Sequence, residues 1–287
     1  MSQAADVTAR LARLFVYPVK SCAGVELREA QLAETGLDLD RAWMVVDERG
    51  EFVTQRELPR MALVKPQLKL HEVVLRAPGM LALHLAIDTV EEPARVRVWN
   101  DEVPAYDMGD VAAQWFSDFL GRKLRLVRFD PEHRRLSNLK WTGGAEAANQ
   151  FSDGYPLLVV GTASLDALNA RLAAAGHAPV GIERFRPNLV LEGLDAHDED
   201  NLGLVRIATE AGEVRLRPVK PCPRCPIPNI DPATAESSPA VGDTLQAYRR
   251  DDRVGGAPTF GMNAIIVAGG DAILRVGQAV AADYRFD

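Results

Sequence analysis

The residues of this chain that are best suited to chemistry lie in one basic, proline-rich segment, residues 215–236. The segment contains two thiols, Cys222 and Cys225, separated by two residues. Five of its prolines lie close together, at positions 218, 221, 223, 226 and 228. Proline prevents a regular helix and removes backbone donors from any central strand, so we expect a stiff extended loop. Four cations and no acid lie between residues 215 and 225, namely Arg215, Arg217, Lys220 and Arg224.

This concentration of positive charge has two chemical consequences. Nearby cations lower the pKa of a thiol, and the thiolate is both the nucleophile and the metal ligand. The same cations bind phosphate or another anion. Four interpretations therefore stay open at this point. The thiols are half of a zinc site completed by Cys22 and a histidine, a thioredoxin-like pair, structural cysteines, or one metal ligand inside an anion-binding site.

Other polar residues stand where predicted strands end or turn. Lys20 and Ser21 follow an apolar run that a turn would close, and Arg41 precedes another apolar run. Arg186 and Asn188 flank a proline that stiffens their spacing. An ammonium, a hydroxyl and two guanidinium groups presented in this way would suit an anionic ligand.

The elements that position these residues are predicted to be mostly short strands. Alternating or continuous apolar runs indicate strands at residues 25–27, 42–50, 81–87, 95–99, 188–192, 213–219, 262–268 and 272–277. Many short strands with few helices predict an α+β, mostly β fold built from barrels or sandwiches.

Two helices are predicted between these strands. Residues 110–121 have a helical apolar face, with Asp110 as the expected N-cap. Residues 162–176 carry leucines at helical spacing, with Thr162 or Ser164 as the expected cap.

Charge and hydropathy exclude several classes of function. Lys and Arg number 33 against 40 Asp and Glu, for a net charge of −7. An acidic chain does not suit a general nucleic-acid binder, whose affinity rests on a basic surface. No apolar run approaches the ~18 residues of a membrane helix. The N-terminus shows no targeting leader, so we expect a cytoplasmic protein. The acidic cluster at residues 195–200 is expected to form a solvated loop.

The cysteine count and the missing motifs narrow the redox chemistry. Three cysteines cannot form a disulfide scaffold or an all-cysteine iron–sulfur cluster, which needs about four thiolates. The chain has no dinucleotide-binding glycine fingerprint, no phosphate loop and no serine nucleophile elbow. A redox enzyme of this sequence would therefore need a different cofactor and a separate source of electrons.

Six short motifs occur in a fixed order along almost the whole chain. They are YPVKS (17–21), GLDLDRAWMV (36–45), FSDGYP (151–156), FRPN (185–188), VKPCPRC (219–225) and FGMN (260–263). In this order they resemble the MOSC-domain proteins, and within them the branch of the mitochondrial amidoxime-reducing component and its bacterial hydroxylaminopurine-resistance relatives. The segment after Cys225 departs from that branch, because it carries prolines at 226 and 228.

The resemblance implies a fold, a cofactor and a set of site residues. A β-barrel-like MOSC N-terminal domain (1–128) would pack on a β-barrel MOSC domain (129–287) with few helices. A molybdenum–molybdopterin cofactor, and not pyridoxal phosphate, would bind between them. Cys225 would ligate molybdenum and take part in catalysis, whereas Cys222 would be structural. The residues implied in cofactor binding are Lys20, Ser21, Arg41, Ser152, Asp153, Arg186, Asn188, Arg224 and Asn263, with Asp153 also a candidate catalytic proton donor.

The resemblance also implies an oxidoreductase that reduces N-hydroxylated or other N-oxygenated small molecules. The electrons would come from a separate ferredoxin-like protein, a flavin reductase or a cytochrome b5. We expect neither nucleic acid nor a membrane as a partner. Two alternatives remain at this stage. One is a non-catalytic carrier of the molybdenum cofactor or of sulfur, and the other is a zinc or dithiol protein.

Overall fold

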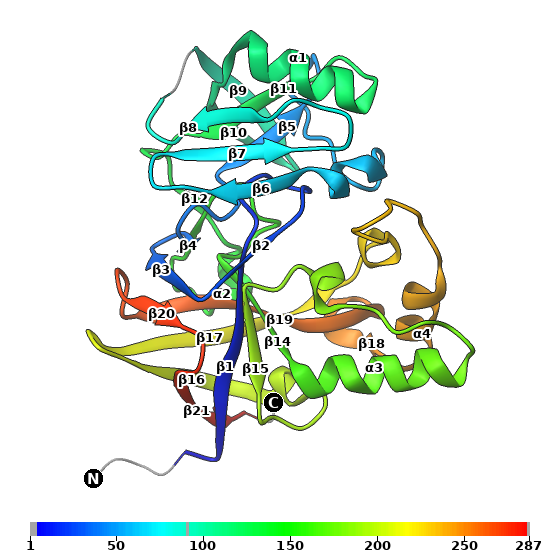
Figure 1. Ribbon diagram of the computed structural model, residues 1–287. Coiled ribbons are helices and arrows are strands. Elements are labelled where there is room, and N and C mark those ends of the chain that lie inside the picture. The colour runs from blue at the N-terminus through cyan, green and yellow to red at the C-terminus, as the bar shows by residue number, and fades with distance from the viewer. Residues whose placement is uncertain (1–4, 90–91, 286–287) are drawn as a thin grey trace.

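A closed barrel of seven strands forms the lower half of the molecule in Figure 1. The structure, a computed structural model, describes residues 5–89 and 92–285. In order around the barrel the strands are β14 (Leu157–Gly161), β15 (Leu189–Glu192), β1 (Val7–Val16), β21 (Ala279–Tyr284), β16 (Leu202–Thr209), β17 (Gly212–Pro223) and β19 (Ala257–Ala268). Pairing of β14 with β19 closes the ring. Two short strands attach to it, β2 (Val25–Leu27) on β1 and β18 (Arg250–Asp251) on β19.

Two antiparallel sheets make up the upper half of the molecule (Figure 1). The first consists of β5 (Trp43–Val46), β11 (Arg125–Phe129), β10 (Asp101–Asp107) and β9 (Pro93–Val98). The second consists of β6 (Lys65–Leu68), β7 (Glu72–Arg76) and β8 (Leu83–Ala86). Helix α1 (Gly109–Leu120) buries its aromatic face in a core shared with Trp43 and the second sheet. This burial of large apolar side chains stabilises the upper half independently of the barrel.

Smaller elements complete the two halves and their junction. They are the strands β3 (Glu29–Ala33), β4 (Gly36–Leu37) and β20 (Ile273–Arg275), the pair β12 (Arg135–Leu136) and β13 (Ala148–Asn149), the helices α2 (Leu139–Thr142), α3 (Thr162–Ala174) and α4 (Ala240–Tyr248), and the 3₁₀ turns η1 (Pro59–Leu63), η2 (Ile182–Phe185), η3 (Asp198–Asn201), η4 (Ile227–Asn229) and η5 (Asp252–Val254). The prediction of an α+β, mostly β protein with few helices and a β-barrel is confirmed. No helix in the described part of the chain is long and apolar enough to span a bilayer.

The first strand belongs to the barrel and not to the sheets that follow it in sequence. β1 pairs antiparallel with β15 and β21, both from the C-terminal half of the chain. After β1 the chain leaves the barrel, builds the upper half and returns. The predicted division between residues 1–128 and 129–287 stays a prediction. β1 lies before that boundary in sequence but pairs with strands that lie after it. Because of this path, the segment that follows β1 lies at the junction of the two halves.

The proline-rich segment is a strand for longer than the sequence predicted. β17 continues to Pro223 and pairs with β19 through the residues expected to form a loop. The ladder accommodates the prolines by shifting register between Pro218 and Lys220 and again between Pro221 and Pro223. Such irregularities are where a strand tolerates a residue without a backbone donor. The extended loop thus begins only at Arg224.

The predicted helices are present, but their predicted caps are wrong. Asp110 lies inside the first turn of α1, and Asp107 Oδ1 instead accepts a hydrogen bond of 2.8 Å from Gly109 N. Neither Thr162 nor Ser164 caps α3, whose N-cap makes no side-chain hydrogen bond. Asp107 lies two residues before Gly109 and accepts a hydrogen bond from its free N–H. The sequence pattern alone did not distinguish Asp107 from Asp110 as the residue that caps α1.

The acidic cluster at residues 195–200 is not the solvated loop that the sequence predicted. Glu199 is completely buried, and Ser164 Oγ of α3 donates to Glu199 Oε2 at 2.6 Å. Burial raises the pKa of Glu199 to about 7 and lowers the pKa of His197 to about 4. The cluster therefore fixes η3 against α3 from inside the molecule.

Replacing Glu199→Gln should change the pH dependence of stability. The unfolded chain ionises this group near pH 4.5, whereas the folded chain keeps it protonated up to about pH 7. Its stabilising contribution is thus complete below pH 4.5 and is lost as the pH rises to about 7. A neutral glutamine keeps its contribution at every pH. Across that range the free energy of unfolding of the variant should therefore rise relative to wild type by an amount on the order of 2 kcal/mol.

Urea denaturation of both proteins between pH 4 and pH 8 would measure this difference. His197 contributes with the opposite sign over the lower part of the range, because its folded pKa is depressed. His197 is present in both proteins, so its contribution cancels when their free energies of unfolding are subtracted. A difference that does not vary with pH would contradict the burial of an uncharged Glu199.

Candidate functional site

A cavity of about 430 Å³ lies where the upper half meets the barrel. Its walls include all ten residues that the sequence proposed for the site: Lys20, Ser21, Arg41, Ser152, Asp153, Arg186, Asn188, Arg224, Cys225 and Asn263. Segments separated by more than 200 positions in sequence therefore meet at one place. The structure establishes this proximity, whereas the role assigned to each residue stays a prediction.

The lining of this cavity is strongly cationic. Among the described residues it contains a single carboxylate, Asp153, and six cationic side chains, Lys20, Arg41, Arg56, Arg186, Lys220 and Arg224. The chain as a whole carries a net charge of −7, so the excess of positive charge is local. A concave surface lined by charge of one sign focuses the field and attracts ligands of the opposite sign. The cavity is therefore built to hold an anion.

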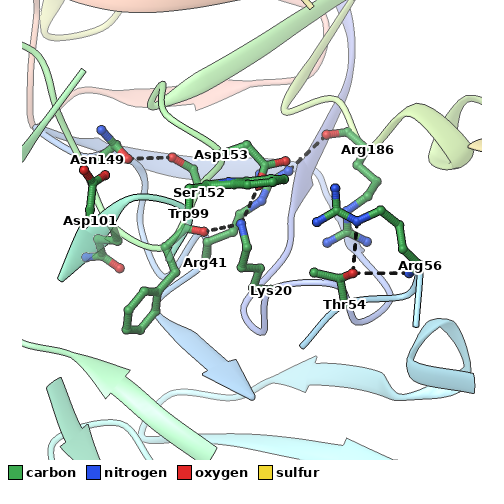
Figure 2. A network of polar contacts seen from close by, with 12 residues as sticks. Lys20, Arg41, Thr54, Arg56, Trp99, Asp101, Asn149, Ser152, Asp153 and Arg186 are labelled. Carbon is green, nitrogen blue, oxygen red and sulfur yellow. Dashed lines mark hydrogen bonds and ion pairs between the residues drawn. The ribbon is translucent and has the colours of Figure 1, made fainter. Parts of the chain in front are cut away.

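Lys20 and Asp153 form the ion pair at the centre of this lining (Figure 2). Lys20 Nζ lies 2.5 Å from Asp153 Oδ1 and donates to the carbonyl oxygen of Phe151 at 2.7 Å. Burial lowers the pKa of Lys20, and Asp153 offsets part of that effect. Trp99 Nε1 donates to the same carboxylate oxygen at 3.2 Å.

The same contacts determine the ionisation of Asp153. The side chain of Asp153 is largely exposed. Its partial desolvation in the cavity works against the negative charge, but the Lys20 ammonium outweighs this effect and holds the pKa of Asp153 below its usual range. A carboxyl that remains ionised carries no proton at neutral pH. The geometry thus fits Asp153 as the partner that orients Lys20, and it counts against the predicted role as proton donor.

Two arginines converge on the ring of Tyr17. The guanidinium carbons of Arg41 and Arg186 lie 4.4 and 4.2 Å from the ring centroid. Arg41 also pairs with Asp40 and donates to Asn188 Oδ1 at 3.2 Å. Burial, together with the nearby charge of Arg41, lowers the pKa of Arg186 to about 10. Arg186 is still cationic at neutral pH, and an anion beside it would relieve that electrostatic cost.

The end of β17 carries Cys222, and the loop that follows the strand presents the Cys225 thiol to the cavity. Cys225 is exposed, whereas Cys222 is half-buried. Arg224 Nη1 donates to Cys222 Sγ at 3.0 Å, and Arg224 Nη2 donates to the carbonyl oxygen of Phe185 at 3.0 Å. Arg224 Nε is buried and has no hydrogen-bond partner among the described residues. The loop therefore offers an open sulfur next to a guanidinium with an unused donor.

Three of the predicted residues use their side chains to hold the cavity walls together. Asn188 donates to the Phe15 carbonyl oxygen at 3.2 Å and accepts from Leu158 N at 3.1 Å, which ties β1 to β14. Ser152 Oγ donates to an asparagine oxygen at 3.0 Å, and Asn263 Nδ2 donates to the carbonyl oxygen of Lys220 at 3.3 Å. Their contribution is to shape the walls, with donors and acceptors largely committed to the protein.

The sequence did not identify the part of the cavity wall that comes from the upper half. Arg56 stacks its guanidinium 4.7 Å from the centroid of Trp99, and Arg56 Nε donates to Thr54 Oγ1 at 3.2 Å (Figure 2). No motif marks these residues. The structure places Trp99 in the tight turn between β9 and β10 with a positive φ of 57°, and no signal in the sequence indicated this. Such a residue outside glycine suggests a position that tertiary contacts impose.

The structure removes Cys22 as a ligand of the zinc site that the sequence left open. Cys22 is fully buried in the core of the upper half, and burial raises the pKa of its thiol to about 12. In residues 5–89 and 92–285, no group of three His, Cys, Asp or Glu side chains is placed to hold a metal ion. Cys222 and Cys225 would thus have to bind zinc without a further thiol or histidine of this chain beside them.

A cationic cavity should bind an inorganic anion such as pyrophosphate. We expect millimolar pyrophosphate at low ionic strength to raise the melting temperature of the wild-type protein, because only the folded state has the cavity. Arg186→Ala should weaken binding roughly tenfold, since a charge-assisted hydrogen bond is worth about 1.5–3 kcal/mol. Isothermal titration calorimetry would measure both affinities.

Arg275→Ala is the matched control, because Arg275 pairs with Glu29 on the surface and lies outside the cavity lining. This variant should bind pyrophosphate as wild type does. Equal losses in both variants would show that the anion binds to surface charge in general and not in the cavity.

Comparison with known proteins agrees with this geometry. Residues 8–123 match the MOSC N-terminal beta barrel domain, and residues 146–281 match the MOSC domain. Mitochondrial amidoxime-reducing component 1 of Mus musculus is 34% identical over 93% of this chain and 82% of that protein. Mitochondrial amidoxime reducing component 2 of Rattus norvegicus is 32% identical over 94% of this chain and 82% of that protein. Molybdenum cofactor sulfurase of Homo sapiens is 28% identical over 82% of this chain, which spans 28% of that protein. Since both domain models match in order and the six motifs meet at one cavity, the chain belongs to the MOSC-domain family.

Proposed function

We propose that this protein is a molybdenum-cofactor-dependent oxidoreductase that reduces N-hydroxylated compounds. The observation that carries the proposal is the meeting of six cationic side chains and the exposed Cys225 thiol in one cavity. An anionic cofactor with a thiolate-ligated metal needs both features. The names of the relatives from Mus musculus and Rattus norvegicus support the substrate class, because they describe proteins that reduce amidoximes.

The residues present fit a molybdenum–molybdopterin group. The phosphate of such a group would pair with guanidinium groups, for which Arg186 and Arg224 line the cavity. Cys225 would supply a soft thiolate ligand, which suits a redox metal. When bound, the cofactor supplies the two-electron redox chemistry.

The chain's own residues supply binding and orientation. Asp153 and the Phe151 carbonyl oxygen hold Lys20 in one position, and Trp99 and Arg56 close the wall on the side of the upper half. The overall reaction breaks an N–O bond and forms an N–H bond, with two electrons and two protons consumed and one water released. We propose that the electrons come from a separate protein of the ferredoxin, flavin reductase or cytochrome b5 type.

Cys225→Ser tests the proposed metal ligand. The variant should fold as wild type and lose nearly all reduction of benzamidoxime to benzamidine, because a serine hydroxyl is a poor ligand for a soft metal site. The assay would use reduced methyl viologen as electron donor and quantify benzamidine by chromatography. Wild-type turnover by this variant would refute the assignment.

Cys222→Ser is the matched control, at the end of β17 three residues before Cys225. Its sulfur accepts a hydrogen bond from Arg224, a role that a serine oxygen can also fill. We expect this variant to keep most of the activity. A loss as large as that of Cys225→Ser would instead favour a function that needs both thiols.

A second candidate function is that of a cofactor carrier. The similarity to the molybdenum cofactor sulfurase of Homo sapiens favours it, since the same cavity would serve to hold a cofactor without turning over a substrate. A carrier would transfer its bound cofactor to an apo-enzyme and would show no repeated turnover with reduced methyl viologen. The reductase should show the reverse.

A further inference from the structure

A buried ion pair outside the cavity contacts the strand that holds the Cys225 loop. Asp200 belongs to η3 and Arg249 directly follows α4, and the two pair through Asp200 Oδ2 and Arg249 Nη2. Their side chains are 10% and 14% exposed, and neither residue lines the cavity. The pair therefore acts on the site only through the residues that it contacts.

Arg249 connects this ion pair to β19. Its backbone oxygen accepts a hydrogen bond of 2.9 Å from Thr259 N, and its Nε donates to the Thr259 carbonyl oxygen at 3.3 Å. Its Nη2 donates to Thr259 Oγ1, also at 3.3 Å. Thr259 is buried, so these contacts are shielded from water. One guanidinium thus fixes both the backbone and the side chain of Thr259, a geometry that the planar fork of arginine allows.

Thr259 lies opposite the end of β17, where the Cys225 loop begins. It is the register partner of Pro223, and Arg224 N donates to the carbonyl oxygen of Pro258 at 2.8 Å. Pro223 and Arg224 are the two residues that precede Cys225. The position of Thr259 therefore determines where the chain carrying Cys225 enters the cavity wall.

Phe260, the next residue of β19, gives a second connection to the same loop. Its ring stacks on Phe185 with the centroids 4.0 Å apart, and the Phe185 carbonyl oxygen accepts from Arg224 Nη2 at 3.0 Å. His197, which precedes η3, meets the ring of Phe260 edge-on, with the centroids 6.1 Å apart. The segment that carries Asp200 thus contacts β19 at this residue as well.

The buried pair is poorly suited to stabilising the fold by its charges. Burial raises the pKa of Asp200, and the nearby Arg249 offsets only part of that effect. Asp200 Oδ1 is buried and has no hydrogen-bond partner in the part of the chain that the structure describes. A buried ion pair with an unsatisfied atom is often no more stabilising than an apolar pair of similar volume. The pair therefore contributes more to geometry than to stability.

We propose that Arg249, held by Asp200, is a positioning residue that fixes the direction in which Cys225 enters the cavity. The ion pair orients the guanidinium, the guanidinium fixes Thr259, and β19 transmits this constraint to the two residues before Cys225. The inference rests on the proposed function only in taking Cys225 as the metal ligand. A thiol held in this way is already in place when a cofactor binds.

Replacing the pair by apolar residues of similar volume tests this role without leaving a buried charge unpaired. Asp200→Leu combined with Arg249→Met removes the side-chain hydrogen bonds from Arg249 to Thr259. This double variant should keep a melting temperature close to that of wild type. Arg206→Met combined with Asp283→Leu is the matched control, because that ion pair joins β16 to β21 and lies outside the cavity lining.

Alkylation of the cofactor-free chain measures where the Cys225 thiol lies. Relative to a free thiol, a thiol facing the cationic cavity should react faster with negatively charged iodoacetate than with neutral iodoacetamide at low ionic strength. Trypsin cleaves after Arg224, so mass spectrometry measures Cys225 separately from Cys222. The double variant at position 200 and 249 should lower the iodoacetate-to-iodoacetamide ratio of rate constants roughly threefold, and the control pair should keep the wild-type ratio.

Two results would overturn the inference. One is an unchanged ratio in the folded double variant, and the other is a wild-type ratio no higher than that of a free thiol. If the double variant does not fold, Thr259→Val replaces it, because valine keeps the volume, removes Oγ1 and leaves the ion pair in place. Thr259→Val should lower the ratio in the same direction by a smaller factor, and the wild-type ratio in this variant would then refute the positioning role.

These measurements separate the inference from the proposed function. If the wild-type protein neither retains molybdenum nor reduces benzamidoxime, the proposed function fails, and the alkylation ratios still decide whether Arg249 positions Cys225. If the wild-type protein is an active reductase and the double variant keeps the wild-type ratio, the function stands and the positioning role fails.

Discussion

The structure depends on holding several positively charged side chains in fixed directions around one cavity. Each of four cations is anchored by a backbone carbonyl: Lys20 by Phe151, Arg41 by Arg186, Arg186 by Cys22 and Arg224 by Phe185. A carbonyl oxygen fixes the direction of a donor but cancels no net charge. The side chains are thus oriented before a ligand arrives. Lys20 and Arg41 also pair with Asp153 and Asp40, so the positive charge left for a ligand is mainly that of Arg186 and Arg224.

The path of the chain explains how these anchors come together. β1 completes the barrel, and the turn that follows it carries Lys20 across to the upper half, where its backbone N–H donates to the Trp43 carbonyl oxygen at 2.8 Å. Arg186 reaches back to the same turn from the barrel through the Cys22 carbonyl oxygen. The cavity therefore exists only when both halves are folded and in contact. This makes the junction a structural requirement and not a passive linker.

The sequence could predict the site more completely than the fold around it. Each of the ten residues proposed for the site lines the cavity. The strand at residues 81–87 and the helix at 110–121 were also predictable from apolar periodicity. In contrast, Trp99 reaches the cavity through packing between distant segments, and no local pattern encodes that.

The same limit explains the errors. Glu199 is acidic in an acidic run, and only the approach of α3 makes it a buried, uncharged group. The prolines of β17 argue against a strand locally, but pairing with β19 outweighs them through register shifts. In both cases a tertiary contact supplies more free energy than the local preference opposes.

The most direct test of the central claim is the molybdenum and zinc content per chain, measured by inductively coupled plasma mass spectrometry. The protein would be expressed in a host that makes molybdopterin and incubated with free cofactor before desalting. Our account predicts close to one molybdenum per chain with little zinc. Zinc without molybdenum, or no molybdenum after incubation with cofactor, would contradict it.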